Sequence, residues 1–257
     1  MKILALDAST EACSAAIYVN GEIIERLAIT PRKHIEVLMP MIKEVMEESG
    51  RQFSDLDGLA FAAGPGSFAG LRIACGFIQG LGAGLNLPIV PVSTLETLAL
   101  PVFEDHPEAN VLTIMDAKMN EIYWAVYTRG EKGRLVTVFE DQVSSMEAMI
   151  EAVKAHGFES LYGVGDGFDL DPALKETLNL VEISSRKHPR AGEVALLAIS
   201  DIEQNLGLYA DQVSPIYLRH DIALTIEEQE AARQKKAAEA EAAQTDAPAE
   251  SAESAES

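Results

Sequence analysis

Apolar residues run together or alternate in three short segments at the start of the chain. Residues 2–7 form an apolar run that ends at Asp7, and residues 12–19 alternate small and apolar side chains. Asn20-Gly21 follows, which is a strong signal for a two-residue hairpin turn, and residues 22–29 continue as a third segment. The pattern predicts three strands, of which the second and third form a hairpin.

Helical and strand patterns alternate in the next part of the chain. Residues 32–49 have helical periodicity, and residues 58–63 form a short apolar run typical of a buried parallel strand. Residues 68–85 contain no proline and are apolar on most sides, as a buried helix is. A strand at 88–92 and a helix over about 94–103 are expected to follow.

A charged segment at 104–108 interrupts the pattern and indicates a boundary. The elements predicted beyond it are strands at 110–115, 121–127, 135–139 and 160–164, helices at 144–156, 172–177 and 191–205, and an extended segment at 215–219. We therefore expect a first lobe at 1–104 and a second lobe at 105–222, whose last helix can return to the first. Residues 223–257 are rich in Ala, Glu and Ser and predict a disordered acidic tail.

The stretch GPGSFAGLR at 64–72 joins a predicted strand to a predicted helix. Glycine permits positive φ, and amides at a helix start can hold an anion, so Gly64, Gly66 and Ser67 fit a phosphate cradle. An isolated Gly-Pro-Gly is more often just a tight strand-to-helix turn. No Gly-Lys-Ser/Thr follows, so the stretch is not a Walker loop.

The turn after the first strand is a second candidate phosphate loop. Asp7, Ser9 and Thr10 place an acid and two hydroxyls at a strand end, where they can hold a phosphate and its magnesium. A polar hairpin loop explains the same residues and is the simpler interpretation. Asp116 ends the first strand of the second half in the same way.

The helix at 68–85 has a face without side chains. Gly76, Gly80 and Gly84 recur every four residues, while Gly82 lies off that face. An interior helical glycine costs roughly 1 kcal/mol relative to alanine, so a close neighbour is expected to offset the cost. That neighbour is either a helix of the same chain or a helix of a partner.

The helix at 32–49 carries more apolar residues than one core stripe requires. Met39, Met41, Ile42, Val45 and Met46 predict a second apolar face that is free for a partner.

The net charge and the composition limit the kinds of partner and the cellular compartment that we expect for this chain. The net charge is −21, which is expected to prevent unaided binding to RNA or DNA. No uninterrupted apolar run reaches the 18 to 20 residues of a membrane span, and Asp7 comes too early for a signal peptide. The two cysteines are not paired as CxxC, so we expect reduced core thiols in a cytoplasmic protein.

No metal or catalytic set can be assembled from the spacing. His34 would need a second ligand three or four residues on, but Val37 and Leu38 stand there. We therefore expect His34 to make a polar contact at the helix start and expect the chain to hold no metal.

Several motifs together resemble one family. They are DASTEACS at 7–14, PRKH at 31–34 with Pro40, GPGSFAGLR at 64–72, STLETL at 93–98, Asp116-Ala117 with EIYWA at 121–125, and PIYLR at 215–219. Over residues 1–222 the chain resembles the TsaB family, also called YeaZ. The resemblance implies an α/β fold of the actin-like, sugar kinase and Hsp70 (ASKHA) superfamily, with duplicated ribonuclease H-like sheets in two lobes.

The resemblance also implies a function. TsaB proteins are accessory subunits that aid TsaD in forming N6-threonylcarbamoyladenosine at position 37 of tRNAs reading codons that begin with A. It implies a heterodimer with TsaD, a ternary complex with the ATPase TsaE, a homodimer when alone, tRNA contact only through the complex, and no membrane. ATP and metal are then expected on partner subunits, with no cofactor on this chain.

The resemblance places the partner surface on the first two helices and also shows departures. The interface residues expected are Met39, Met41, Ile42, Val45, Met46, Arg72, Ile73, Gly76, Phe77, Gly80 and Gly84. The family usually has threonine where this chain has Ala8 and Ala69, so the phosphate loops are expected to be degenerate. The alternative is an enzyme acting alone, either an actin-like ATPase using Asp7, Ser9 and Asp116 or a metallopeptidase, which the missing histidine pair argues against.

Overall fold

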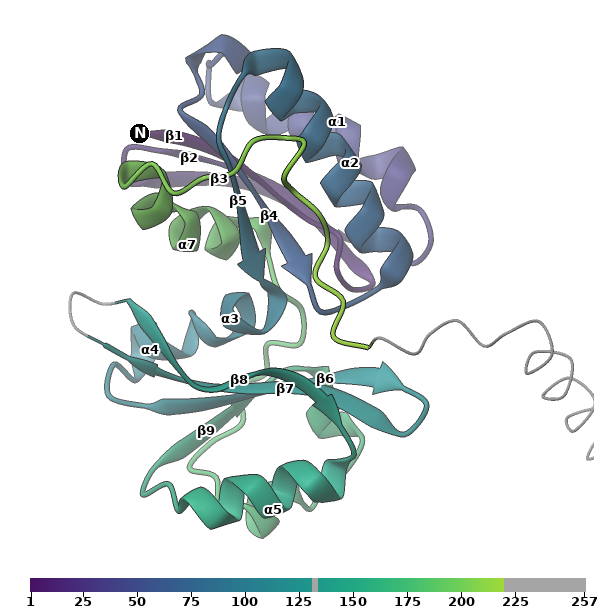
Figure 1. Ribbon diagram of the computed structural model, residues 1–257, viewed down its shortest axis with the longest axis vertical. Helices are drawn as coiled ribbons and strands as arrows, with labels where there is room; N and C mark the ends of the chain where they lie inside the picture. Colours follow the sequence, from purple (N-terminus) through teal and green to yellow (C-terminus); the bar gives the residue numbers. More distant parts are fainter. Residues whose placement is uncertain (131–133, 220–257) are drawn as a thin grey trace, which may run out of the picture. The chain divides into compact units, whose positions relative to one another are not determined.

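The computed structural model describes residues 1–130 and 134–219 (Figure 1). The predicted tail at 223–257 and the last residues of the predicted second lobe lie outside the described residues. Residues Met1–Leu218 form one compact unit that contains two sheets. The division into lobes between residues 104 and 105 stays a prediction.

The first sheet has five strands in the order β3-β2-β1-β4-β5. Its elements, in chain order, are β1 (Lys2–Asp7), β2 (Ala12–Val19), β3 (Glu22–Ile29), α1 (His34–Glu48), η1 (Phe53–Asp55), β4 (Gly58–Gly64), α2 (Phe68–Leu85) and β5 (Ile89–Ser93). Strands β1, β2 and β3 pair antiparallel, whereas β1, β4 and β5 pair parallel. The three-strand start and the bounds of α2 are as the sequence predicts.

Alternation along the buried strands gives this sheet two apolar faces. Leu4 and Leu6 of β1 point into the core beneath α1 and α2, while Ile3 and Ala5 point into the core beneath α7 (Ala191–Glu203). Figure 1 shows α1 and α2 on one side of the sheet and α7 on the other. Both faces are therefore covered, as a sheet with parallel strands requires.

The second sheet has four strands in the order β8-β7-β6-β9. The remaining elements are α3 (Thr94–Ala99), α4 (Val102–Asp105), β6 (Asn110–Lys118), β7 (Glu121–Arg129), β8 (Leu135–Ser144), α5 (Met146–His156), β9 (Leu161–Val164), η3 (Asp166–Asp169) and α6 (Leu174–Thr177). Leu95 and Phe103 pack on one face of this sheet, and Met149 and Val153 of α5 pack on the other.

Two elements differ most from their predicted extent. The helix expected over 94–103 is two helices, because Pro101 has no amide hydrogen and disfavours helix at the residue before it. Strand β8 extends past residue 139 to Ser144, where its pairing with β7 continues opposite Ile122.

Helix α2 is an exception to the expectation that no segment of the chain is long and apolar enough to span a membrane. By length and composition alone its 18 residues pass that test. Its buried side, which includes Leu71, Ala74 and Ile78, packs against the first sheet. Core packing therefore accounts for the apolar residues on this side of the helix.

Candidate functional site

One face of α2 is made of glycine and is open. A Cβ atom added at Gly76, Gly80 or Gly84 would meet no atom within 4 Å, whereas one added at Gly82 would lie 2.7 Å from Ile89 Cδ1. The close neighbour predicted for the glycine face is therefore not supplied by the described part of the chain.

The neighbouring helix α1 has a single apolar stripe, so the prediction of a second apolar face is wrong. Met41, Ile42, Val45 and Met46 are all buried in the core beneath α1. Together with Leu38 they follow the spacing of one core-facing stripe. These four side chains are not available as a free face. Met39 is only half-buried, and Ile35 is 64% exposed.

A shallow apolar hollow lies where α1 and α2 meet. It has a volume of about 410 Å³ and is lined by Ile35 of α1 and by Arg72, Ile73, Gly76 and Phe77 of α2. Four of the residues that the sequence assigns to a partner surface thus lie together. Ile35 lines the hollow with them. It was not predicted from the sequence, because it precedes the buried stripe of α1 by one turn.

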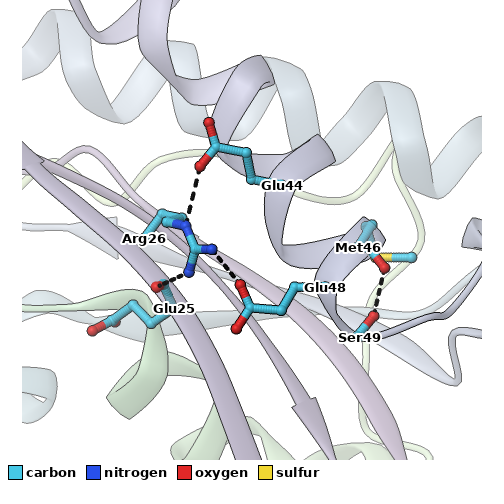
Figure 2. Close-up of polar contacts among 6 residues, drawn as sticks. All are labelled: Glu25, Arg26, Glu44, Met46, Glu48 and Ser49. Atoms are coloured by element: carbon cyan, nitrogen blue, oxygen red, sulfur yellow. Dashed lines mark hydrogen bonds and ion pairs between the residues drawn. The ribbon is translucent and has the colours of Figure 1, made fainter.

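An arginine on β3 fixes α1 in place. Arg26 donates to Glu44 at 3.1 Å and also to Glu48, both on α1, and it donates to the Glu25 carbonyl at 3.0 Å (Figure 2). Ser49 donates to the Met46 carbonyl at 2.7 Å and closes the last turn of the helix. The α1 wall of the hollow is therefore held to the sheet at the end opposite Ile35.

The first candidate phosphate loop contains a buried carboxyl. Ser9 donates to Asp7 Oδ1 from its amide and from its hydroxyl, both at 2.8 Å, while no described residue donates to Asp7 Oδ2. Burial raises the pKa of Asp7 to about 6, with Glu193 and Glu25 adding to the rise and the Ser9 hydrogen bonds opposing it. The two Ser9 hydrogen bonds favour the Asp7 anion, but burial outweighs them, so the carboxyl group ionises less readily than an exposed one.

The two candidate phosphate loops lie against each other. The Ser67 amide donates to the Ser9 carbonyl at 2.7 Å, and the Gly70 amide donates to Ser67 Oγ at 3.3 Å. A Cβ atom at Gly66 would lie 2.3 Å from the Ser9 carbonyl oxygen, so glycine is required for this approach. Two amides of the expected cradle are thus used within the chain.

The other residues that the sequence singled out make contacts of their own. Thr10 Oγ1 lies 3.5 Å from His188 Nδ1. Asp116 accepts from the Lys118 amide at 2.7 Å and from its Nζ at 2.5 Å, and the Asp116 amide donates to Asp166 at 3.2 Å. Within residues 1–130 and 134–219, no hydrogen bond joins Asp116 to the Asp7 turn.

His34 does not make the predicted polar contact through Nε2. The side chain is buried, and its Nε2 atom has no hydrogen-bond partner among the described residues. The described part of the chain also contains no group of three or more His, Cys, Asp or Glu side chains placed to hold a metal.

A stack beside the hollow escaped the sequence analysis. Arg72 Cζ lies 3.8 Å from the centroid of the Phe68 ring, and Arg72 Nε donates to the Tyr217 hydroxyl at 3.0 Å. The Phe68 and Tyr217 rings are 5.3 Å apart. The partners are separated by 145 residues, so only the two motifs GPGSFAGLR and PIYLR hinted at the contact.

A polar network between the two sheets was also missed. Ser93 Oγ, at the end of β5, donates to Asp141 Oδ2 of β8 at 2.5 Å, and Tyr127 donates to the other oxygen of Asp141. Burial raises the pKa of nearby Glu96 to about 7, and Asp141 and Asp201 add to the rise.

Comparisons with known proteins agree on tRNA threonylcarbamoyladenosine biosynthesis. The family model for TsaD, tRNA N6-adenosine threonylcarbamoyltransferase, matches residues 27–252. The tRNA threonylcarbamoyladenosine biosynthesis protein TsaB of Escherichia coli (strain K12) is 34% identical over 231 residues, which is 87% of this chain and 96% of that protein. TsaB of Haemophilus influenzae (strain ATCC 51907 / DSM 11121 / KW20 / Rd) is 35% identical over 229 residues, covering 86% and 95% of the two chains.

A solved structure extends the comparison to the fold. YeaZ from Pseudomonas aeruginosa superposes with a TM-score of 0.74 at 31% identity, over 84% of this chain and 99% of that one. The α/β fold class that the order of elements predicts is therefore confirmed.

Proposed function

Because the chain belongs to the TsaB family of tRNA threonylcarbamoyladenosine biosynthesis proteins, we propose that it is the non-catalytic partner of TsaD. In this role it aids the transfer of threonylcarbamoyl from threonylcarbamoyl-AMP to adenosine 37 of tRNAs that read codons starting with A. It joins TsaD in a heterodimer and TsaE in a ternary complex.

The open glycine face is the observation that carries this proposal. Gly76, Gly80 and Gly84 lower the stability of α2 and are covered by nothing in the described chain. Such a face lets the backbone of another helix approach closely, and the hollow beside it at Ile73 and Phe77 accepts apolar side chains. The first two helices thus supply a surface whose burial by a partner would stabilise the chain.

The same surface supports a homodimer when TsaD is absent. Two copies with identical apolar patches can pair about a two-fold axis, each presenting α1 and α2 to the other. The homodimer and the TsaD heterodimer then compete for one surface.

The geometry of the two candidate phosphate loops supports a non-catalytic role for this chain. The Ser67 and Gly70 amides are already bonded inside the chain, and the backbone of Ser9 lies where Gly66 leaves no side chain. These contacts support the proposal that the two loops no longer bind a phosphate. ATP and metal therefore belong to the partner subunits, and the net charge of −21 leaves tRNA contact to the complex.

The test is Gly80→Leu, which inserts a bulky side chain into the open glycine face. Because a side chain at this position meets no atom of the described chain, the variant is expected to stay folded, which circular dichroism checks. In size-exclusion chromatography it should form neither the homodimer nor the TsaD complex. Ala155→Leu, which adds similar bulk at an exposed position of α5, should form both. If Gly80→Leu folds and still binds TsaD, the partner surface is elsewhere.

A further inference from the structure

We infer that Arg72 is a receptor for one carboxylate of the partner, at the edge of the hollow between α1 and α2. The inference rests on the proposed function and deepens it, because it gives the chemistry of the partner segment. That segment carries an Asp or Glu side chain next to apolar residues that enter the hollow.

The guanidinium of Arg72 is oriented before any partner arrives. Phe68 lies against one face of the group, with 3.8 Å from Cζ to the ring centroid, and the Tyr217 hydroxyl accepts from Nε at 3.0 Å. An exposed arginine normally loses much rotamer freedom when it binds, and the aromatic stack has already restricted this side chain. Binding through Arg72 therefore costs less ordering than binding through a free surface arginine.

The remaining donors of Arg72 have no acidic partner nearby. A guanidinium has five N–H donors, and Tyr217 takes the one on Nε. Among the described residues no carboxylate forms an ion pair with Arg72, although Arg26, Arg134, Arg186 and Arg190 each form one. In a chain with a net charge of −21, an exposed arginine without such a partner is available for an acid from outside.

The surroundings favour a protein carboxylate over a phosphate. Ile35, Ile73 and Phe77 make the hollow apolar, and Arg72 is the one cation among the residues that line it. A single guanidinium balances one carboxylate in a two-pronged hydrogen bond. A phosphate group carries more charge, and the acidic chain would leave that charge uncompensated.

The open glycine face lets one partner helix contact both Arg72 and the apolar hollow. Gly76 lines the hollow beside Arg72, and no atom lies within 4 Å of where its side chain would be. A partner helix can therefore approach closely enough for a short acidic side chain to reach the guanidinium. Because Arg72 then sits at the edge of an apolar contact, the Coulomb attraction in the ion pair is greater than at an open surface, and loss of the guanidinium leaves the partner acid uncompensated.

The experiment measures binding of the full-length chain to purified TsaD by calorimetry. Arg72→Lys keeps the charge but loses the planar fork and its stack, and we expect it to bind about tenfold more weakly. Arg72→Ala should bind about 30-fold more weakly. The control Arg51→Lys changes an exposed arginine beyond the other end of α1 and should stay within about twofold of the original chain.

A charge reversal identifies the partner acid. Arg72→Glu should abolish binding, and one Asp→Arg or Glu→Arg substitution on the apolar helix surface of TsaD should restore it. The inference is overturned if Arg72→Lys binds within about twofold of the original chain, or if no single reversed acid restores binding. It is also overturned if the loss appears only when tRNA is present, because the ligand is then a phosphate.

The outcomes separate this inference from the proposed function. If the unsubstituted chain does not bind TsaD, the proposed function fails. If Gly80→Leu abolishes TsaD binding while Arg72→Lys does not weaken it, the proposed partner surface on α1 and α2 is supported. Only the inference that Arg72 binds a partner carboxylate is then overturned.

Discussion

The Ser93 hydroxyl donates to Asp141 at 2.5 Å and joins the end of the first sheet to an edge strand of the second. The same oxygen accepts from the Leu95 and Glu96 amides and so caps α3. One serine thus starts a helix and satisfies a largely buried carboxyl group.

Ser93→Ala should therefore destabilise the chain more than the loss of a helix cap does. A lost cap costs about 1 kcal/mol, and a buried carboxyl left short of a donor adds about 1–3 kcal/mol. Urea unfolding should show a decrease of about 2–4 kcal/mol. Ser145→Ala removes only the cap of α5 and should cost about 1 kcal/mol. Equal losses for the two variants would mean that Asp141 does not depend on Ser93.

Asp7→Asn should stabilise the chain near neutral pH. Because the folded pKa of about 6 lies above the ordinary value of 3.8, the folded state holds more protons than the unfolded state between these values. The stability from Asp7 is therefore full below about pH 4 and is lost as the pH rises through 6. Asparagine keeps an oxygen for Ser9 without the charge but buries an NH2 group in place of Oδ2, so the gain at neutral pH should be smaller than the value of about 3 kcal/mol that the pKa shift alone gives.

Thermal unfolding from about pH 4 to pH 7.5 tests this prediction. The difference between the original chain and Asp7→Asn should grow with pH across this range. Asp105→Asn, at an exposed position, controls for the change in net charge and should show no such growth. A difference that shrinks as the pH rises would contradict the pKa of Asp7.

Gly80→Ala should make the isolated chain more stable. The new methyl group enters open space on α2, so the change keeps only the gain in helix propensity, about 0.5–1 kcal/mol. Gly82→Ala has the same propensity gain but places its Cβ 2.7 Å from Ile89 Cδ1, so it should gain less or lose stability. Urea midpoints of the two variants, measured at a dilution where the chain is monomeric, compare them directly.

The isolated chain should neither bind ATP tightly nor hold a metal. The Ser67 amide already donates to the Ser9 carbonyl, so this donor of the predicted phosphate cradle is in use within the chain. Calorimetry with ATP and magnesium should show no stoichiometric binding, and metal analysis should find less than one zinc or iron ion per chain. Tight binding with hydrolysis would instead favour an actin-like ATPase.

A chain that ends at residue 222 should fold and support tRNA modification. Residues Met1–Leu218 form one compact unit, and the sequence after Ile226 has no apolar side chain larger than alanine. Thermal unfolding and a pull-down with TsaD should match those of the full chain. Loss of TsaD in the pull-down would assign a docking role to the acidic tail.

The strands and helices could be predicted where local patterns decide the structure. The hairpin at Asn20-Gly21 and the continuous helix from Phe68 to Leu85 follow from turn chemistry and periodicity. The buried stripe of α1 could not be counted correctly, because Met39 and Met41 look alike in sequence and only packing shows which one is buried.

The site was predictable in part for the same reason. A glycine every fourth residue is visible in the sequence, but whether the face is open depends on segments far along the chain. The hydrogen bond from Arg72 to Tyr217 and the one from Ser93 to Asp141 join residues 145 and 48 positions apart. The first contact depends on how the chain returns after α7, and the second on how β8 lies beside the end of β5, which no local pattern encodes.

We expect the exposed glycines of α2 to shorten the lifetime of the free subunit as well. A helix that loses stability at several positions opens more often, and open segments are where proteases cut. A partner that covers the face shifts this balance by mass action, in proportion to its own concentration. The supply of partner in the cell would thus set how much of this protein accumulates, without any dedicated signal between the two genes.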